Sequence, residues 1–268
     1  MHEVVSVGFD FENDAHALIC GASKGIGRGA ALAVARLGVK VTALARSADL
    51  LQELEVELRS AGARETRALV ADLDQRDALF AQVESLIRAA GPIHILLNNT
   101  GGPAAGPLVE AEEGAFLQAF ERHVLVSHGL VRRVLPGMVA SGFGRIINVL
   151  SSSVREPIPG LGVSNTIRGA MASWSKTLSR ELPPSVTINN VLPGKIDTGR
   201  LSELKVALAR KAGASPEEIE ASWLANIPEG RLGTPEEIGG VIAFLASPAA
   251  SFVRGVSLPV DGGQLRVI

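Results

Sequence analysis

A short apolar run leads directly into a glycine-rich turn in the stretch Ala17-Leu18-Ile19-Cys20-Gly21-Ala22-Ser23-Lys24-Gly25-Ile26-Gly27. An alanine-rich segment follows, so the stretch predicts a strand, a tight turn and a helix. Glycines at such a turn permit positive φ and close approach of the backbone to a ligand, and the first N–H groups of the helix attract phosphate. A dinucleotide pyrophosphate fits there, although the glycine spacing alone is also compatible with a purely structural turn. The expected contacts are Gly21, Ser23, Lys24, Gly25, Ile26 and Gly27.

The second predicted strand, Val39 to Ala45, ends at Arg46-Ser47, where a parallel α/β fold places the adenosine ribose. An acidic side chain there would accept hydrogen bonds from a free 2′-hydroxyl, whereas an arginine pairs with a 2′-phosphate. Lys24 in the glycine turn adds a second cation. The sequence therefore favours NADP(H) over NAD(H), and the alternative for Arg46 is a solvated surface charge.

The overall composition predicts one globular domain spanning residues 1–268. With 46% hydrophobic and 20% charged residues the chain suits a packed fold, and a net charge of −2 offers no basic surface to nucleic acid. The single cysteine, Cys20, excludes a disulfide within the chain. Met1 to Asp14 lacks the basic start and apolar stretch of a secretion signal, and no run approaches membrane-spanning length. We therefore expect a cytoplasmic protein that binds neither nucleic acid nor membrane.

Apolar runs of β type alternate with segments of helical period along the chain. Helices are expected over the periodic leucines of residues 50–58, over residues 79–87, and around residues 114–140, 163–182 and 235–247. This order predicts an α/β fold, a single-domain doubly wound (Rossmann-type) sheet that is mainly parallel and flanked by helices, with ligands beyond the carboxyl ends of the strands. The expected strands are Ala17 to Cys20, Val39 to Ala45, Glu65 to Val70, Ile93 to Leu97, Arg145 to Leu150, Val186 to Val191 and Val256 to Val260.

Further motifs in sequence order resemble the short-chain dehydrogenase/reductase family, from about Ala15 to Gly263. Asp72-Leu73 is similar to the family's acidic contact for the adenine, and Asn98-Asn99-Thr100-Gly101 to its Asn-Asn-Ala-Gly turn. Pro193-Gly194-Lys195-Ile196-Asp197-Thr198 resembles the segment that contacts the nicotinamide carboxamide in the family, and Val260-Asp261-Gly262-Gly263 completes the series. The resemblance implies that the cofactor site includes Asp72, Leu73, Asn99, Thr100, Gly101, Pro193, Gly194, Ile196 and Thr198.

The catalytic positions depart from the family pattern, because the chain contains no tyrosine. The family uses a serine, a tyrosine thirteen residues later, a lysine four residues beyond that, and an asparagine on an earlier helix. Ser151 occupies the serine position. The other three positions hold Ser164 for the tyrosine, Arg168 for the lysine and His123 for the asparagine. The resemblance therefore implies an oxidoreductase with a degenerate catalytic set.

These replacements separate cofactor binding from acid–base chemistry. A phenol titrates near pH ~10 and can be brought toward neutrality, whereas a serine hydroxyl cannot and also has a shorter reach. Arg168 can bridge ribose hydroxyls but will not relay protons. His123 could supply the missing proton, directly or through water; the alternative is a histidine that packs within its helix. The five histidines and one cysteine show no metal-ligand spacing, so no metal is expected.

Residues 199–230 resemble the mobile substrate lid of the family. Their apolar face suits either a substrate with hydrocarbon character or packing on the core. In the family, the helices around His123 and Ser164 form subunit contacts, which implies a homodimer or homotetramer. Two functions stay open: an NADP(H)-dependent oxidoreductase that interconverts a carbonyl and an alcohol in a small-molecule substrate, and a catalytically silent NADP(H)-binding sensor or structural protein.

Overall fold

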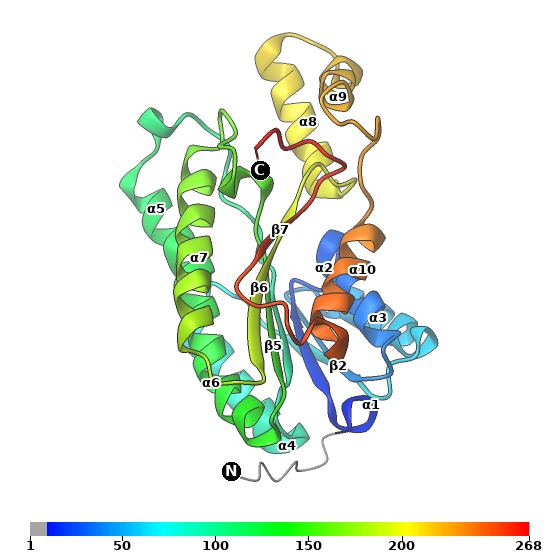
Figure 1. Ribbon diagram of the computed structural model, residues 1–268. Coiled ribbons are helices and arrows are strands. Elements are labelled where there is room, and N and C mark those ends of the chain that lie inside the picture. The colour runs from blue at the N-terminus through cyan, green and yellow to red at the C-terminus, as the bar shows by residue number, and fades with distance from the viewer. Residues whose placement is uncertain (1–9, 268) are drawn as a thin grey trace.

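Within residues 10–267, which the computed structural model describes, the central element is a seven-stranded sheet (Figure 1). Its strands follow the order β3-β2-β1-β4-β5-β6-β7, and every neighbouring pair is parallel. The predicted strands and the doubly wound α/β fold are confirmed, whereas the expectation about the amino terminus falls largely on residues 1–9, outside the described range. The strands are β1 (His16–Cys20), β2 (Lys40–Ala45), β3 (Thr66–Val70), β4 (Ile95–Asn98), β5 (Gly144–Val149), β6 (Val186–Pro193) and β7 (Ser257–Val260).

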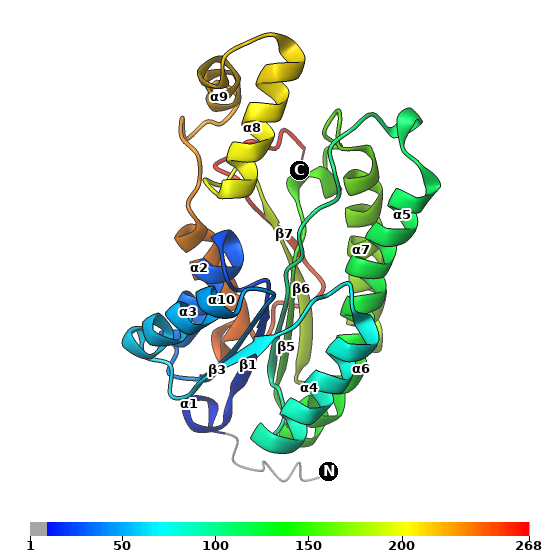
Figure 2. The ribbon, with the colours of Figure 1, turned by 180° about the vertical axis from the view of Figure 1, so that it is seen from behind.

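Helices cover both faces of the sheet, as Figures 1 and 2 show from opposite sides. Alternate residues of β1 point to opposite faces, so that Ile19 joins one apolar core and Leu18 the other. Helices α2 and α10 approach closely at a glycine, because a Cβ at Gly29 would lie only 2.5 Å from the carbonyl oxygen of Pro235. One layer contains α2 (Gly25–Ala35), α3 (Ala48–Ala61) and α10 (Pro235–Ala246); the other contains α4 (Arg76–Ala90), α6 (Val126–Ser141) and α7 (Gly162–Glu181).

A ladder of buried amides crosses the sheet from β4 to β7. Asn98 on β4 donates from Nδ2 to Oδ1 of Asn148 on β5 at 2.8 Å, and Asn148 donates to Oδ1 of Asn190 on β6 at 2.9 Å. Asn190 in turn donates to the hydroxyl of Ser257 on β7 at 3.0 Å. These residues are direct partners in the strand register, so the ladder fixes the relative height of the strand ends that carry the site.

The helix predicted around residues 114–140 is divided in the structure. Helix α5 (Glu113–Phe120) and helix α6 are joined by a π-helical turn, η2 (Glu121–Leu125). A π turn inserts one extra residue into the helical ladder, and such turns are frequent at functional sites. This one turns His123 and Val124 into the protein interior.

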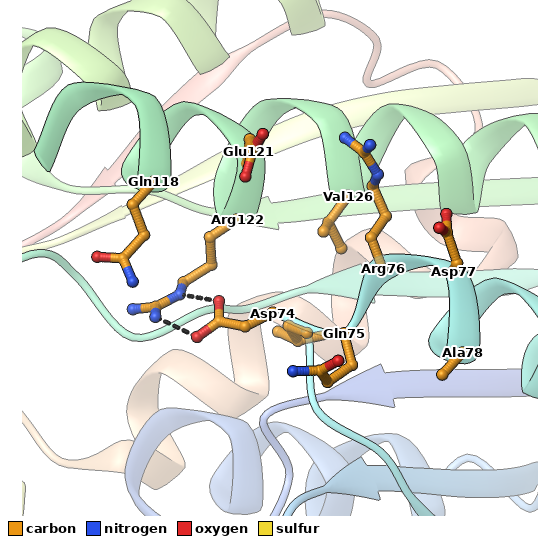
Figure 3. A pocket seen from close by; sticks show the side chains of 10 residues that line it. Asp74, Gln75, Arg76, Asp77, Ala78, Gln118, Glu121, Arg122 and Val126 are labelled. Atoms are coloured by element: carbon orange, nitrogen blue, oxygen red, sulfur yellow. Dashed lines mark hydrogen bonds and ion pairs between the residues drawn. The ribbon is translucent and has the colours of Figure 1, made fainter. Parts of the chain in front are cut away.

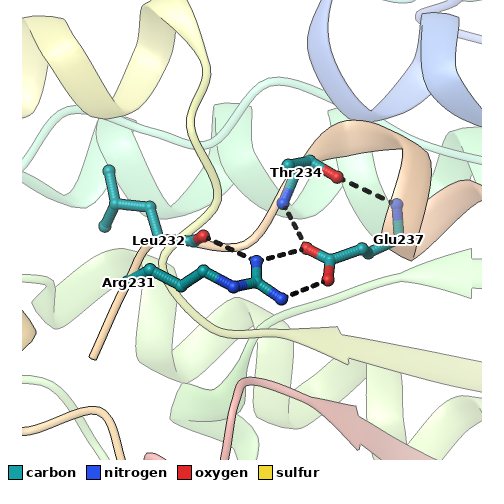
Figure 4. Close-up of polar contacts among 4 residues, drawn as sticks. All are labelled: Arg231, Leu232, Thr234 and Glu237. Carbon is teal, nitrogen blue, oxygen red and sulfur yellow. Dashed lines mark hydrogen bonds and ion pairs between the residues drawn. The ribbon is translucent and has the colours of Figure 1, made fainter. Parts of the chain in front are cut away.

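Two helices stand beyond the carboxyl ends of the strands, in the segment predicted as a lid: α8 (Gly199–Ala212) and α9 (Pro216–Leu224) (Figure 1). The chain returns to the sheet at Thr234, where a capping box with Glu237 starts α10. Arg231 holds the same carboxylate at 2.6 Å (Figure 4), which fixes the end of the segment.

The remaining elements are short. They are α1 (Phe11–Asp14) and three single 3₁₀ turns, η1 (Leu108–Glu110), η3 (Ser152–Val154) and η4 (Pro248–Ala250). Among the helices of the described residues, none combines the length and the apolar character needed to cross a membrane.

Candidate active site and nucleotide cleft

The glycine turn has the geometry that a close-approaching ligand requires. Gly21 has a φ of +63°, a left-handed value that suits glycine. A Cβ at Gly27 would lie 2.0 Å from the carbonyl oxygen of Gly21 and 2.7 Å from the Nδ2 atom of Asn99, so a side chain at this position would disrupt the turn. The same Nδ2 donates to the carbonyl oxygen of Cys20 at 3.3 Å, which ties the turn after β1 to the turn after β4. Tight packing beneath the turn leaves its outer side, at the start of α2, available to phosphate.

A cleft of about 490 Å³ opens in front of this turn. It lies at the point where the strand order reverses between β1 and β4, the usual ligand crevice of a doubly wound sheet. The sequence-predicted residues that line it are Gly21, Ser23, Lys24, Arg46, Ser47, Asp72, Leu73, Asn99, Thr100 and Gly101.

The other predicted cofactor residues do not line this cleft, but several are close to it. Gly25, Ile26 and Gly27 form the start of α2 behind the turn. A Cβ at Gly25 would lie 3.1 Å from Cγ2 of Thr198, so the Pro193 to Thr198 segment reaches the glycine turn. Gly194 is held by its N–H, which donates to the carbonyl oxygen of Val260 at 3.1 Å, and Ile196 is buried.

The cleft is bordered by an ion pair that the sequence did not predict. The guanidinium of Arg122, in the π turn, clamps the carboxylate of Asp74: Nε donates to Oδ1 at 2.5 Å and Nη2 donates to Oδ2 (Figure 3). The hydrogen bonds from Arg122 lower the pKa of Asp74. Both residues also line an adjoining hollow of about 360 Å³. The pair anchors the π turn to the loop after β3, and only the proximity of two segments far apart in sequence reveals it.

His123 faces inward from the π turn and is only 2% exposed. Its Nδ1 atom is hydrogen-bonded to the hydroxyl of Thr100, and within residues 10–267 its buried Nε2 atom has no hydrogen-bond partner. Burial, with the nearby cations Arg168 and Arg122, lowers the pKa of His123 to about 3. The imidazole is therefore neutral near pH 7, and the structure encloses it beside a residue of the cofactor cleft.

Arg168 lies under the ends of two strands. Its Nη1 atom donates to the carbonyl oxygen of Val149 at 2.7 Å, and its Nη2 atom donates to the carbonyl oxygen of Thr100 at 3.3 Å. Burial lowers its pKa to about 10, so the guanidinium stays charged at neutral pH. Arginine at this position thus braces the segments that follow β4 and β5, a role the sequence did not reveal.

The two serines occupy different settings. Ser151 immediately precedes η3 and its Oγ atom accepts a hydrogen bond from the backbone N–H of Ser153 at 3.1 Å. Its own O–H can therefore be donated outward. Ser164 lies half-buried in the first turn of α7, one helical turn before Arg168. The structure thus brings His123 and Arg168 together around Thr100, with Ser151 at the neighbouring strand end. No cluster of three or more potential metal ligands occurs among the residues described.

Comparison with known proteins agrees with this geometry. A sequence profile described as "Enoyl-(Acyl carrier protein) reductase" matches residues 21–264. The chain belongs to the short-chain dehydrogenase/reductase family. It shares with that family of NAD(P)-dependent oxidoreductases both the parallel sheet and the ordered motifs around the cleft.

Several relatives match almost the whole chain. A 3-oxoacyl-(acyl-carrier-protein) reductase of Pseudomonas aeruginosa is 33% identical over 92% of this chain and 96% of its own length. A 2-keto-3-deoxy-L-fuconate dehydrogenase of Xanthomonas campestris is 34% identical over 92% of this chain and 78% of its own length. Among solved structures, the L-sorbose reductase of Gluconobacter frateurii complexed with NADPH and L-sorbose is similar, with a TM-score of 0.88 and 28% identity over 95% of this chain and 97% of that one.

Proposed function

We propose that this short-chain dehydrogenase/reductase uses NADP(H) to interconvert a carbonyl group and an alcohol in a small-molecule substrate. The observation that carries the proposal is the 490 Å³ cleft, where the glycine turn, Arg46 and Asp72 converge at the switch point of the sheet. A relative solved with NADPH and a keto sugar supports both the cofactor and the reaction class.

The residues present fit the cofactor. Lys24 and Arg46 line the same cleft and provide two cations for a 2′-phosphate. Asp72 and Leu73 would hold the adenine of the cofactor. Residues 99–101 would contact the central part of the dinucleotide, and the segment from Pro193 through Ile196 to Thr198 would contact the nicotinamide carboxamide. Arg168 uses two of its N–H donors on carbonyl groups, and the remaining donors are left for ribose hydroxyls. When bound, the nicotinamide supplies or accepts the hydride.

The chain's own residues then have to handle the substrate oxygen and its proton. The Oγ atom of Ser151 already accepts a hydrogen bond from the backbone N–H of Ser153, which leaves its hydroxyl hydrogen to be donated. In this proposal Ser151 donates that hydrogen to the substrate oxygen. Ser164 adds a second hydroxyl with too short a reach to replace a phenol. Water fills the resulting space and delivers the proton. The neutral, enclosed imidazole of His123 favours water over the alternative that His123 is itself the proton donor.

A second candidate function is based on positions 123, 164 and 168, where the residues differ from the catalytic residues expected from the family pattern. The residues that line the cleft include no histidine, cysteine or tyrosine. A catalytically silent NADP(H)-binding sensor or structural protein would keep the same cleft. Turnover distinguishes the two functions, whereas binding does not.

Two structural proposals accompany the function. Residues 199–230, with α8 and α9, act as a lid over the substrate side of the site. The exposed apolar side chains of Leu108, Val109, Leu117 and Phe120, on η1 and α5, support a homodimer or homotetramer. Light scattering in solution would measure that assembly.

The experiment for the proposed function is NADPH oxidation with a panel of aldehydes, ketones and keto sugars, and NADP⁺ reduction with the matching alcohols. The wild-type chain is expected to turn over at least one member of the panel. Ser151→Ala is expected to lower kcat by roughly 10²-fold, the usual loss when one donor to a developing oxyanion is removed, while NADPH binding is unchanged. Tight NADPH binding without any turnover would instead support the silent binder.

A further inference from the structure

A separate cavity, of about 420 Å³, is lined in part by Ser152, which directly follows Ser151. It is enclosed by residues 152–159 after β5, by Lys195 after β6, by α9 of the lid, and by the carboxyl-terminal residues 264–266. Strands β5 and β6 are adjacent and parallel, so the residues that follow them meet at one edge of the sheet. Ser152 follows Ser151 directly, and Lys195 follows Gly194, which places the cavity next to the proposed hydride site.

Lys195 is the unusual residue of this cavity. It is partly buried, its Nζ atom lies 5.3 Å from the ring centroid of Trp223 on α9, and burial lowers its pKa. Within residues 10–267, no carboxylate or hydrogen-bond acceptor partners this ammonium. Lys205, by contrast, pairs with Glu220 within the same lid. A desolvated cation with only an aromatic face beside it gains from an anionic ligand.

The rest of the lining carries one further cation, Arg266, and one carboxylate, Glu156. Arg266 brings a second cation, whose Nη2 atom donates to Oδ1 of Asn226 at 3.1 Å. The single carboxylate in the lining, Glu156, already accepts the backbone N–H of Arg266 at 3.4 Å. Gln264 lines the cavity as well, and its buried Oε1 atom has no hydrogen-bond partner among the described residues. Rotation of that amide would present its N–H groups to a ligand.

We propose that this cavity is a substrate subsite for an oxyanion, so that the preferred carbonyl or alcohol substrate carries a carboxylate or phosphate bound by Lys195. Arg266 adds long-range attraction, and Ser152 and Gln264 offer hydrogen bonds. Trp223 covers the apolar part of the substrate when the lid is in place. This inference rests on the proposed function for the adjacent hydride site, but binding in the subsite can be measured without turnover.

The test uses two pairs of probes that differ in charge: 4-oxopentanoate with 4-oxopentanamide, and dihydroxyacetone phosphate with dihydroxyacetone. NADPH oxidation is measured for the wild-type chain, Lys195→Met, Lys195→Arg and the control Lys211→Met, an exposed lysine of the lid outside the cavity. In parallel, Trp174→Phe leaves Trp223 as the sole tryptophan, whose fluorescence reports binding beside Lys195.

At least one charged probe is expected to bind roughly tenfold to hundredfold more tightly than its neutral partner, the range of one charge-assisted contact. Lys195→Met should remove that difference, Lys195→Arg should retain most of it, and Lys211→Met should retain all of it. Whether the carboxylate probe or the phosphate probe binds more tightly than its neutral partner identifies the preferred anion. The proposal is overturned if neither charged probe perturbs Trp223 more than its neutral partner, or if Lys195→Met weakens charged and neutral probes equally. Absence of NADPH oxidation with every probe would contradict the proposed function and leave the fluorescence result to decide the subsite.

Discussion

The Nη1 atom of Arg168 donates a hydrogen bond to the carbonyl oxygen of Val149, the last residue of β5, at 2.7 Å. The second terminal nitrogen of the same guanidinium reaches the carbonyl oxygen of Thr100 at 3.3 Å. A fork with several donors can bridge two strand ends in this way, whereas a lysine ammonium is a single point charge. Arg168 therefore braces these two segments through its guanidinium, and we propose that it does so without transferring protons.

Replacement of Arg168 should cost stability as well as cofactor affinity. Arg168→Met removes the donor to the carbonyl groups of Val149, which is buried, and of Thr100, which is partly buried, and we expect the free energy of unfolding to fall by about 2–4 kcal/mol. Arg168→Lys should restore one of the two contacts and about half of the loss. Urea unfolding followed by circular dichroism measures both variants. Equal stability of Arg168→Met and the wild-type chain would rule out the brace.

His123 should be dispensable as an acid. If water delivers the proton, His123→Gln, which can still hydrogen-bond the Thr100 hydroxyl, changes kcat by less than about threefold, well below the usual loss for a general acid. Because its pKa is lowered to about 3, His123 is neutral above that value and should contribute no change in kcat between pH 5 and 8. The pH profile of kcat measures this. Loss of turnover in a stably folded His123→Gln variant would show that the histidine supplies the proton.

Acid should destabilise the fold through two buried histidines at the amino ends of the central strands β1 and β4, His16 and His94. The backbone N–H of His16 donates to Nδ1 of His94 at 3.2 Å, and burial, reinforced by Lys40, lowers the pKa of each from 6.5 to about 4. The unfolded chain therefore binds more protons than the folded chain between these values. The contribution of these histidines to the free energy of unfolding is fully present above pH 6.5 and is lost as the pH falls toward 4, with a loss on the order of 3 kcal/mol for His16 alone.

Urea unfolding at a series of pH values measures this loss. The double variant His16→Gln with His94→Asn removes both titrating groups and should flatten the slope, whereas His128→Gln, at an exposed histidine, serves as the matched control. A double variant that loses stability as steeply as the wild-type chain below pH 6.5 would contradict this assignment.

The buried amide ladder should be sensitive at its centre. Asn148 is fully buried and exchanges hydrogen bonds with both Asn98 and Asn190. Asn148→Ala leaves both neighbours unsatisfied and should lower the free energy of unfolding by about 2–4 kcal/mol, measured by urea unfolding. Ser60→Ala, on the exposed face of α3, offers a control with little expected effect. A loss below about 1 kcal/mol would mean that the ladder does not hold the strand ends.

The sequence predicted the strands well because a parallel sheet covered on both faces needs short, continuous apolar runs. Many of the residues predicted to bind the cofactor line one cleft, since Gly21, Arg46 and Asn99 stand directly after a strand and Asp72 two residues after one, and parallel strands bring such positions to one end of the sheet. Local pattern and three-dimensional position coincide at these residues.

The features missed all depend on contacts between distant segments. The pair of Asp74 and Arg122 joins residues 48 positions apart, and its charges in sequence resemble ordinary surface residues. The π turn at residues 121–125 keeps the helical period on either side, so periodicity did not reveal it. Lys195 was noted only as part of the Pro193 to Thr198 motif, because the cavity around it is built from segments distant in sequence: residues after β5, α9 and the carboxyl-terminal residues.

Titration of the wild-type chain with NADPH and with NADH tests the central claim most directly, namely that an NADP(H) cradle is intact in a chain without the family's tyrosine. Isothermal titration calorimetry should show NADPH binding roughly tenfold or more tighter than NADH, because we propose that Arg46 and Lys24, which line the cleft, contact the 2′-phosphate. Arg46→Ala should remove most of that preference, and Arg36→Ala, at an exposed arginine outside the cleft, should leave it unchanged. Failure of both coenzymes to bind the wild-type chain would contradict the account.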